Sequence, residues 1–245
     1  MTSAAQRTIP PELIVSPPDV PSCPANGAVF LIDKPKGETS FNVVREVRRL
    51  TNQRKVGHAG TLDPMATGVL IVLVARPATR LQAAFVHLPK VYEATLRLGE
   101  TTPSHDDETE ITHRCDASGV TDEDLDTACR SFVGTIDQVP PMYSAIKIEG
   151  ERLYKKARRG ETVDRPPRQV SIDSIEITGR SGPDVSFRVA CSKGTYIRSL
   201  ARDWGAALGV GAHLTVLRRT HIGPYHVDNA WRLPTLADAL HSSTS

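Results

Sequence analysis

The segment Gly57–Gly68 and the six apolar residues that follow it, Val69–Val74, constrain the fold more than any other part of the chain. The apolar run has the length and β-branched content of a strand buried on both faces. The loop before it carries His58 and Asp63, and its glycines at positions 57, 60 and 68 permit positive φ and close approach by another backbone. Pro64 denies Asp63 the α region. We therefore expect one carboxylate in a set direction at the rim of a rigid sheet, although an ordinary Asp-Pro turn explains the local pattern equally well.

Composition sets the broad class of protein. With 245 residues, the chain can bury a sizeable core as one large or two small domains. Its 39% hydrophobic and 24% charged residues are typical of a globular protein, and no apolar run approaches the ~20 residues of a membrane span. The cysteines lack metal-binding spacing, so we expect no zinc and free thiols in a reducing cytoplasm: Cys23, Cys115, Cys129 and Cys191.

The distribution of charged residues along the chain is more informative than the net charge. The net charge is only +2, which does not by itself indicate a nucleic-acid-binding protein. However, acidic residues gather between Glu100 and Asp126, and basic ones in 45–55, 147–168 and 193–219. Such segregation gives local positive fields that a polyanion could use.

The N-terminal region differs in composition from the rest of the chain. Residues 1–26 hold six prolines and little amphipathic pattern, which predicts a disordered leader that belongs to no core. Residues 27–245 are then one domain, which begins with a short strand at Ala28–Ile32.

Three later elements bear on the candidate site. A helix capped by Thr39 or Ser40 is expected to carry its apolar stripe on Phe41, Val44, Val47 and Leu50. Val91–Leu98 alternates like a strand, with Tyr92 on the apolar face, where a tyrosine is ordinarily a core residue. After paired strands at 170–178 and 184–192, Thr195 is expected to be an N-cap, which puts Arg198 in the first helical turn. A cation there opposes the helix dipole by roughly 0.3–1 kcal/mol, so we expect an anion close to it.

Residues 149–160 predict a strongly basic helix. Opposing acids are sparse in it, so we favour contact with phosphates over a merely solvated face. Its cations are Arg152, Lys155, Lys156, Arg158 and Arg159.

Four of these segments together resemble the TruB family of tRNA pseudouridine synthases. The family pattern G-H-x-G-x-L-D-P-x-A-x-G is matched at every fixed position by residues 57–68, and K-G-T-Y-I-R by residues 193–198. L-I-D-K-P followed by T-S at 31–40, and L-R-R at 217–219, also resemble family motifs. The family's T-D-T-x-D-x-D-G segment is poorly kept here, where only Thr102 and Asp106 hold their places.

The resemblance runs from about Val29 to Leu240 and implies a fold and a function. The fold is α+β, with a central mixed, mostly antiparallel sheet flanked by helices and loops. The function is isomerisation of the T-loop uridine, position 55 of tRNA, to pseudouridine by a stand-alone monomeric enzyme without an obligatory protein partner. We expect the chain to lack the PUA-type C-terminal domain of many bacterial members. The reaction needs no cofactor, and the sequence has no phosphate-binding glycine motif and no His/Cys metal set.

The resemblance also assigns roles to residues. Asp63 acts at the ribose or the base, and Arg198 pairs with it. Tyr92 stacks on the target base and is also a catalytic candidate that could handle the C5 proton. His58 fills the space that the flipped base leaves, and the rest of the substrate pocket comprises Gly60, Thr61, Leu62, Tyr196 and Leu217. Lys34 and Pro35 support the loop from beneath. Contacts with the tRNA backbone are expected from Arg152, Lys155, Lys156 and Lys193.

Several alternatives stay open at this stage. The aspartate could attack C1′, add to C6 of the base, or remove the C2′ proton. The chain could instead be a non-catalytic module that binds or folds tRNA. A retaining glycosidase is a more distant alternative, because it would need a second carboxylate about 5 Å from the first.

Overall fold

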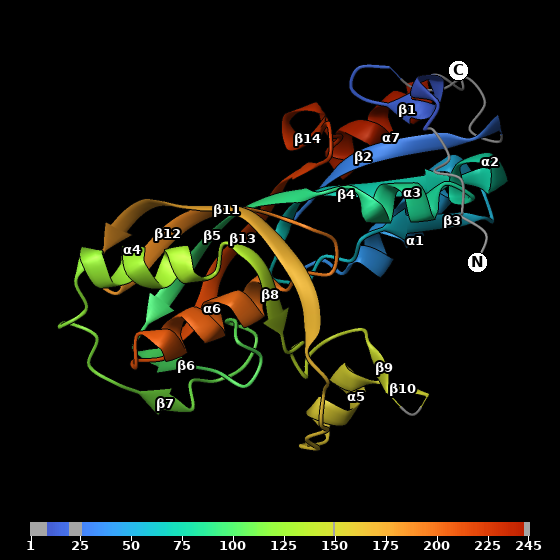
Figure 1. Cartoon of the computed structure of the whole chain (residues 1–245). Coiled ribbons are helices and arrows are strands. Elements are labelled where there is room, and N and C mark those ends of the chain that lie inside the picture. Colours follow the sequence, from blue (N-terminus) through green and yellow to red (C-terminus); the bar gives the residue numbers. More distant parts are fainter. Residues whose placement is uncertain (1–8, 20–25, 149, 243–245) are drawn as a thin grey trace, which may run out of the picture. The chain divides into compact units, whose positions relative to one another are not determined.

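The computed structural model describes residues 9–19, 26–148 and 150–242, which form two compact units (Figure 1). The first unit comprises residues 1–92 and 218–245, and the second comprises residues 93–217. Two strands, β5 (Lys90–Leu98) and β13 (Ala212–Ile222), contribute residues to both units.

The first unit is built around β4 (Thr67–Val74), the predicted buried strand. Seven of its eight residues are buried, which confirms that prediction. The strand order is β1-β2-β4-β13, and β3 also pairs with β4 and β14 with β13. The other strands are β1 (Ile14–Val15), β2 (Ala28–Lys34), β3 (Val56–Ala59) and β14 (Tyr225–His226).

Parallel and antiparallel pairs are mixed in this unit, as the α+β expectation requires. β1–β2 and β4–β13 are parallel, whereas β2–β4, β3–β4 and β13–β14 are antiparallel. The helices are α1 (Ser40–Thr51), α2 (Ala75–Thr79), α3 (Gln82–His87) and α7 (Leu233–Ser242), with 3-10 turns η1 (Pro11–Leu13) and η3 (Val227–Asn229).

The second unit continues from β13 in the order β13-β5-β12-β11-β8. Its strands include β8 (Gly134–Gln138), β11 (Arg168–Ser181) and β12 (Asp184–Cys191), and β11 pairs antiparallel with both neighbours. Two small hairpins add β6 (Glu100–Thr101) with β7 (His113–Arg114), and β9 (Lys147–Ile148) with β10 (Glu151–Arg152). The helices are α4 (Asp122–Ser131), α5 (Leu153–Arg158) and α6 (Ile197–Ala207), and α4 packs against both α6 and β11.

Two expectations about the chain's course are wrong. Residues 9–19 of the expected disordered leader are ordered: Ile14 and Val15 pair with β2, and Leu13 packs against the first unit's core. The rest of that leader, residues 1–8 and 20–25, lies outside the described residues. The basic helix expected at 149–160 is only α5, preceded by the β9–β10 hairpin.

The helix after the Lys34–Gly37 turn begins as predicted but differs in its apolar stripe. Thr39 is the N-cap, and its hydroxyl accepts the Asn42 N–H at 3.0 Å. Val43, Val44 and Val47 are buried, whereas Phe41 is 64% exposed. The prediction that Phe41 belongs to the core-facing stripe is therefore wrong.

Two further findings concern sequence-level expectations. In the described residues, no helix is long and apolar enough to span a membrane. Cys115, Cys129 and Cys191 form no disulfide in the described residues, as predicted, and Cys23 lies outside those residues.

Candidate active site

Asp63 lies between two residues whose backbones are fixed, one by the Ser40 side chain of α1 and the other by the backbone of the turn before that helix. The buried Ser40 hydroxyl accepts the Leu62 N–H at 2.9 Å and donates to the Leu62 carbonyl at 3.0 Å. On the other side, the Pro64 carbonyl accepts the Gly37 N–H at 2.8 Å. The backbone is thus held on both sides of the half-buried Asp63, and the set direction of its carboxylate stays a prediction.

Lys34 supports this loop from within the protein. Its side chain is fully buried, and the ammonium donates to the carbonyls of Pro35 at 2.8 Å, Glu38 at 2.6 Å and Pro64 at 3.3 Å. A buried ammonium needs such oxygen partners, because its desolvation is costly. These contacts support a structural role for Lys34 and the Lys-Pro turn.

Arg219 ties the ends of the same loop to β13. Its guanidinium, in a residue only 1% exposed, donates to the Gly60 carbonyl at 3.0 Å and the Val69 carbonyl at 2.8 Å. Gly68 has φ of 102° and pairs with Arg219, whose carbonyl oxygen would be 2.2 Å from an added Cβ. Arg219 belongs to the L-R-R motif, but nothing in the local sequence predicts its contacts with the loop.

His58 lies on β3 as a half-buried side chain. Gln82 donates to its carbonyl at 2.7 Å, while its ring Nδ1 is buried and has no hydrogen-bond partner among the described residues. Burial, with a smaller contribution from the Arg219 guanidinium, lowers the pKa of His58. The ring is therefore a neutral, flat surface of the kind on which bases stack. In the same loop Thr61 is exposed and Leu62 is buried.

Tyr92 belongs to β5 and follows the predicted alternation. It is 9% exposed, and Ala94, Leu96 and Leu98 are buried on the same face. Its role in stacking on a base stays a prediction.

Arg198 is buried in the first turn of α6, as predicted, but the cap differs. The N-cap is Tyr196, and the Thr195 hydroxyl instead donates to the Ser192 carbonyl at 3.1 Å. The backbone of Tyr196 is clamped by Gln138, which accepts its N–H at 2.8 Å and donates to its carbonyl at 3.1 Å. A side chain from β8 thus satisfies a helix terminus that lacks a local cap.

The anion expected near Arg198 is present within the second unit. Asp106 Oδ2 lies 3.4 Å from Arg198 Nε, and both side chains are almost fully buried. Arg198 also donates to the carbonyls of Ser104 at 3.0 Å and Tyr143 at 2.7 Å. Its pairing with Asp63, which the resemblance implies, stays a prediction.

The divergent segment around Asp106 is compact and ordered. The Asp106 carbonyl accepts the hydroxyls of Thr102 at 2.7 Å and Ser104 at 3.1 Å, and its Oδ1 accepts the Glu108 N–H at 3.0 Å. His105, at φ of 62°, is mostly buried beside arginines. Burial and the charges of Arg202, Arg198 and Arg165 lower its pKa to about 4.

The remaining predicted residues fall into two sets. Leu217 is 5% exposed on β13, whereas Lys193 is exposed. Arg152 and Lys155 are exposed and Lys156 is half-buried on β10 and α5. One cation of this region is already paired, because Arg159 lies 2.8 Å from Glu151 and 2.6 Å from Glu161, and phosphate contact by the others stays a prediction.

A cationic pocket in the first unit lies beside the strand that carries His58. Its volume is about 360 Å³, and Lys55, Arg76 and Arg80 line it, with no acid among its lining residues. Gln82, which holds the His58 carbonyl, also lines it. The sequence offered no signal for this pocket, because its cations come from a loop and from α2.

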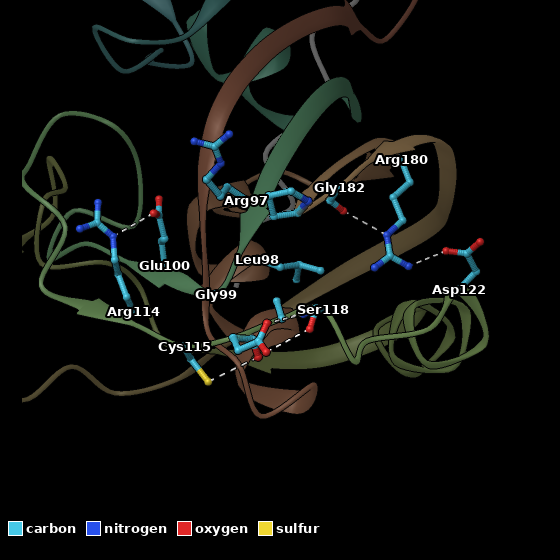
Figure 2. A pocket seen from close by; sticks show the side chains of 13 residues that line it. Arg97, Leu98, Gly99, Glu100, Arg114, Cys115, Ser118, Asp122, Arg180 and Gly182 are labelled. Carbon is cyan, nitrogen blue, oxygen red and sulfur yellow. Dashed lines mark hydrogen bonds and ion pairs between the residues drawn. The ribbon is translucent and has the colours of Figure 1, made fainter.

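A second pocket, of about 800 Å³ in the second unit, contains none of the predicted site residues (Figure 2). Its three arginines are each held by a carboxylate. Arg97 pairs with Asp184 at 2.9 Å, Arg114 with Glu100 at 3.1 Å, and Arg180 with Asp122 at 2.6 Å. The charges of its arginines are thus already balanced by carboxylates.

Comparisons with known proteins agree with the geometry. The family model for the N-terminal domain of TruB family pseudouridylate synthases matches residues 48–197, and that for the tRNA pseudouridylate synthase B C-terminal domain matches residues 198–245. The chain is 51% identical to tRNA pseudouridine synthase B of Thermobifida fusca (strain YX), over 85% of this chain and 74% of that protein. It is 49% identical to the protein of that name from Corynebacterium efficiens, over 90% of this chain and 75% of the other.

Solved structures show the same fold. A Cbf5-Nop10-Gar1 complex contains a chain that is 34% identical, with a TM-score of 0.70 over 94% of this chain. The archaeal box H/ACA sRNP Nop10-Cbf5 complex gives 32% identity and a TM-score of 0.67 over 90% of this chain. This chain spans 60% and 56% of the lengths of those two proteins. With its Asp63 loop, its K-G-T-Y-I-R helix start and these relatives, the chain belongs to the TruB family of pseudouridylate synthases.

Proposed function

We propose that this chain converts the T-loop uridine of tRNA, position 55, to pseudouridine. The observation that carries the proposal is the fixed position of Asp63, between the Ser40-held Leu62 and the Lys34-held Pro64. Relatives about half identical to this chain are named tRNA pseudouridine synthase B. In this reaction the N1–C1′ bond breaks, the base turns, and C5 bonds to C1′, without redox change or hydrolysis.

Asp63 is the carboxylate that acts on the nucleoside. It attacks C1′, adds to C6, or takes the C2′ proton, and each route requires an ionised carboxylate shielded from water. Arg198 pairs with this carboxylate and orients it. Asp106 and the Ser104 carbonyl hold Arg198 in one orientation.

The target nucleotide must leave its stack before it can react, at a cost of a few kcal/mol. His58, as a neutral ring, fills the vacated space. Tyr92 and Tyr196 hold the flipped base by stacking, worth about 1–3 kcal/mol per base. Leu217 closes the pocket.

The tRNA backbone lies along cationic surfaces. Contacts come from Arg152, Lys155, Lys156 and Lys193, and the pocket beside His58 adds Lys55, Arg76 and Arg80. Each neutralised phosphate releases counterions, so the affinity should fall steeply with salt. The enzyme acts as a cytoplasmic monomer, without an obligatory protein partner.

The test is a map of pseudouridine in an unmodified tRNA transcript before and after incubation with the purified chain. We expect one new pseudouridine, at position 55. Modification at another uridine would refute the assignment of the target. Binding without modification in a single-turnover reaction would instead favour the alternative, a non-catalytic module that binds or folds tRNA.

A further inference from the structure

Phe41 is an aromatic side chain whose place in the fold is not explained by burial. At 64% it is the most exposed of the large apolar side chains in the described part of the chain. The rest of the apolar face of α1 is buried through Val43, Val44 and Val47. The helix therefore packs without Phe41.

The backbone of Phe41 is held firmly beside the Asp63 loop. Its neighbour Ser40 makes both hydrogen bonds to Leu62, and Thr39 caps the helix. The Ser40 hydroxyl oxygen lies 3.0 Å from the carbonyl oxygen of Leu62. Phe41 is the next residue after Ser40, and Asp63 is the next residue after Leu62. The Cα atoms of Phe41 and Asp63 are therefore at most about 15 Å apart. This upper bound corresponds to about four stacked bases at ~3.4 Å each, so Phe41 lies within that reach of the Asp63 backbone.

The charge around Phe41 suits a polyanion. Arg45 is exposed one helical turn further, on the same face as Phe41. Lys36 is exposed in the turn before the helix. Of the nearby acids, Glu46 is paired with Arg49 at 2.7 Å, and Glu38 accepts a hydrogen bond from the Asn42 amide at 2.9 Å but keeps its charge. An aromatic ring flanked by cations is the composition with which proteins bind single-stranded nucleic acid.

We propose that Phe41 is a stacking platform for an unpaired base of the substrate RNA, a nucleotide other than the one that reacts at Asp63. Arg45 and Lys36 bind the phosphates next to that base. Specific RNA recognition uses unstacked loop bases in this way, because their faces are free to lie on aromatic side chains. This inference rests on the proposed function for the identity of the RNA, but it assigns a site outside the reacting pocket.

The test compares four side chains at position 41 in the full-length Asp63→Asn chain, which leaves the RNA unmodified during equilibrium binding. Phe41→Ala should weaken binding of the tRNA transcript by about 5- to 150-fold, the range for loss of one stacked base. Phe41→Leu should weaken it as much, because leucine is apolar but has no ring face. Phe41→Trp should stay within about threefold. Val133→Ala, at another exposed apolar position (47%) after the acidic helix α4, is the matched control and should leave affinity unchanged.

A second readout locates the base. A T-arm stem-loop carries 2-aminopurine at one unpaired position at a time. One position should be quenched by the chains with Phe41 or Trp and bright with Ala or Leu. Affinities within twofold across the series would overturn the inference, and so would full retention by Phe41→Leu. A drop in the sedimentation mass of Phe41→Ala would also overturn it, because Phe41 would then join protein copies.

The outcomes separate this inference from the proposed function. If the unsubstituted chain binds RNA in a Phe41-dependent way but makes no pseudouridine, the proposed function fails and the stacking site stands. If it makes pseudouridine and binding does not depend on position 41, only the stacking site fails.

Discussion

The two outer glycines of the Asp63 loop differ in what they tolerate, and Gly68→Ala tests how the loop is joined to the sheet. Gly68 has φ of 102°, and an added Cβ would lie 2.2 Å from the Arg219 carbonyl oxygen and 2.8 Å from its carbon. These are backbone atoms of a paired strand, so relief requires β4 and β13 to separate. A strained φ costs about 1–3 kcal/mol, and overpacking costs about 1–3 kcal/mol. Gly68→Ala should therefore lower the free energy of unfolding by about 2–6 kcal/mol.

Gly57→Ala is the matched control from the same motif. An added Cβ at Gly57 would meet no atom within 4 Å, and its φ lies outside the left-handed region. Replacing such a glycine changes stability by about 1 kcal/mol or less, and can increase it, because the unfolded chain loses freedom.

Urea denaturation of the two variants and the parent chain measures the difference through the midpoint and slope. The reasoning predicts a clear loss for Gly68→Ala and almost none for Gly57→Ala. If the two variants unfold within about 1 kcal/mol of each other, the close approach of Arg219 to Gly68 is not a constraint on the fold.

Three other predictions concern the site's supports. The pKa of His105 is about 4 in the folded protein against 6.5 for an ordinary histidine. The neutral ring therefore contributes about 3 kcal/mol to the free energy of unfolding above pH 6.5, and this contribution is lost as the pH falls toward 4. In urea titrations at several pH values, His105→Asn should flatten this pH dependence. Ser40→Ala leaves the buried N–H and carbonyl of Leu62 without their partner and should cost about 1–3 kcal/mol by the same assay, with slower turnover. The double variant Lys55→Gln and Arg76→Gln should reduce the slope of log affinity for tRNA against log salt concentration by about 1.4–1.8. This is about 0.7–0.9 for each of the two phosphates that the chain no longer neutralises.

Each of these has its own control or contrary result. His105→Asn keeps a residue that tolerates positive φ, so an unchanged pH dependence would show that His105 is not its source. A cost below about 0.5 kcal/mol for Ser40→Ala would mean that water replaces the hydroxyl. The double variant Arg114→Gln and Arg130→Gln removes two exposed, acid-paired cations and should leave the salt slope unchanged. If it lowered the slope as much as the Lys55 and Arg76 variant, the effect would come from the net charge and not from phosphate contacts in the pocket.

Local sequence predicted the elements whose pattern is dictated by burial. β4 was evident because six consecutive apolar residues need a site buried on both faces. The alternation of β5 likewise placed Tyr92 on the inner face. Helical spacing alone could not show that Phe41 is exposed, because it gives the direction of a side chain and not whether another element covers it.

Long-range contacts account for the other differences. Prolines in the N-terminal region suggested disorder, but the apolar pair Ile14–Val15 adds to the edge of β2, and that pairing partner is distant in sequence. The carbonyl of Ser104 accepts a hydrogen bond from Arg198, which lies 94 residues further along the chain. The local sequence around Ser104 therefore could not predict that its loop holds Arg198. The motif resemblance singled out Asp106 only as a position that keeps its residue type, and burial with Arg198 gives that position a physical reason.

The central claim is that the carboxylate of Asp63 performs the chemistry. Its most direct test is tritium release from tRNA labelled at C5 of uridine, under single-turnover conditions, with Asp63→Asn and the parent chain at the same saturating concentration. The account predicts release by the parent chain, none above background by Asp63→Asn, and tRNA affinity of the two chains equal within several-fold. Release by Asp63→Asn at a rate close to that of the parent chain would contradict it.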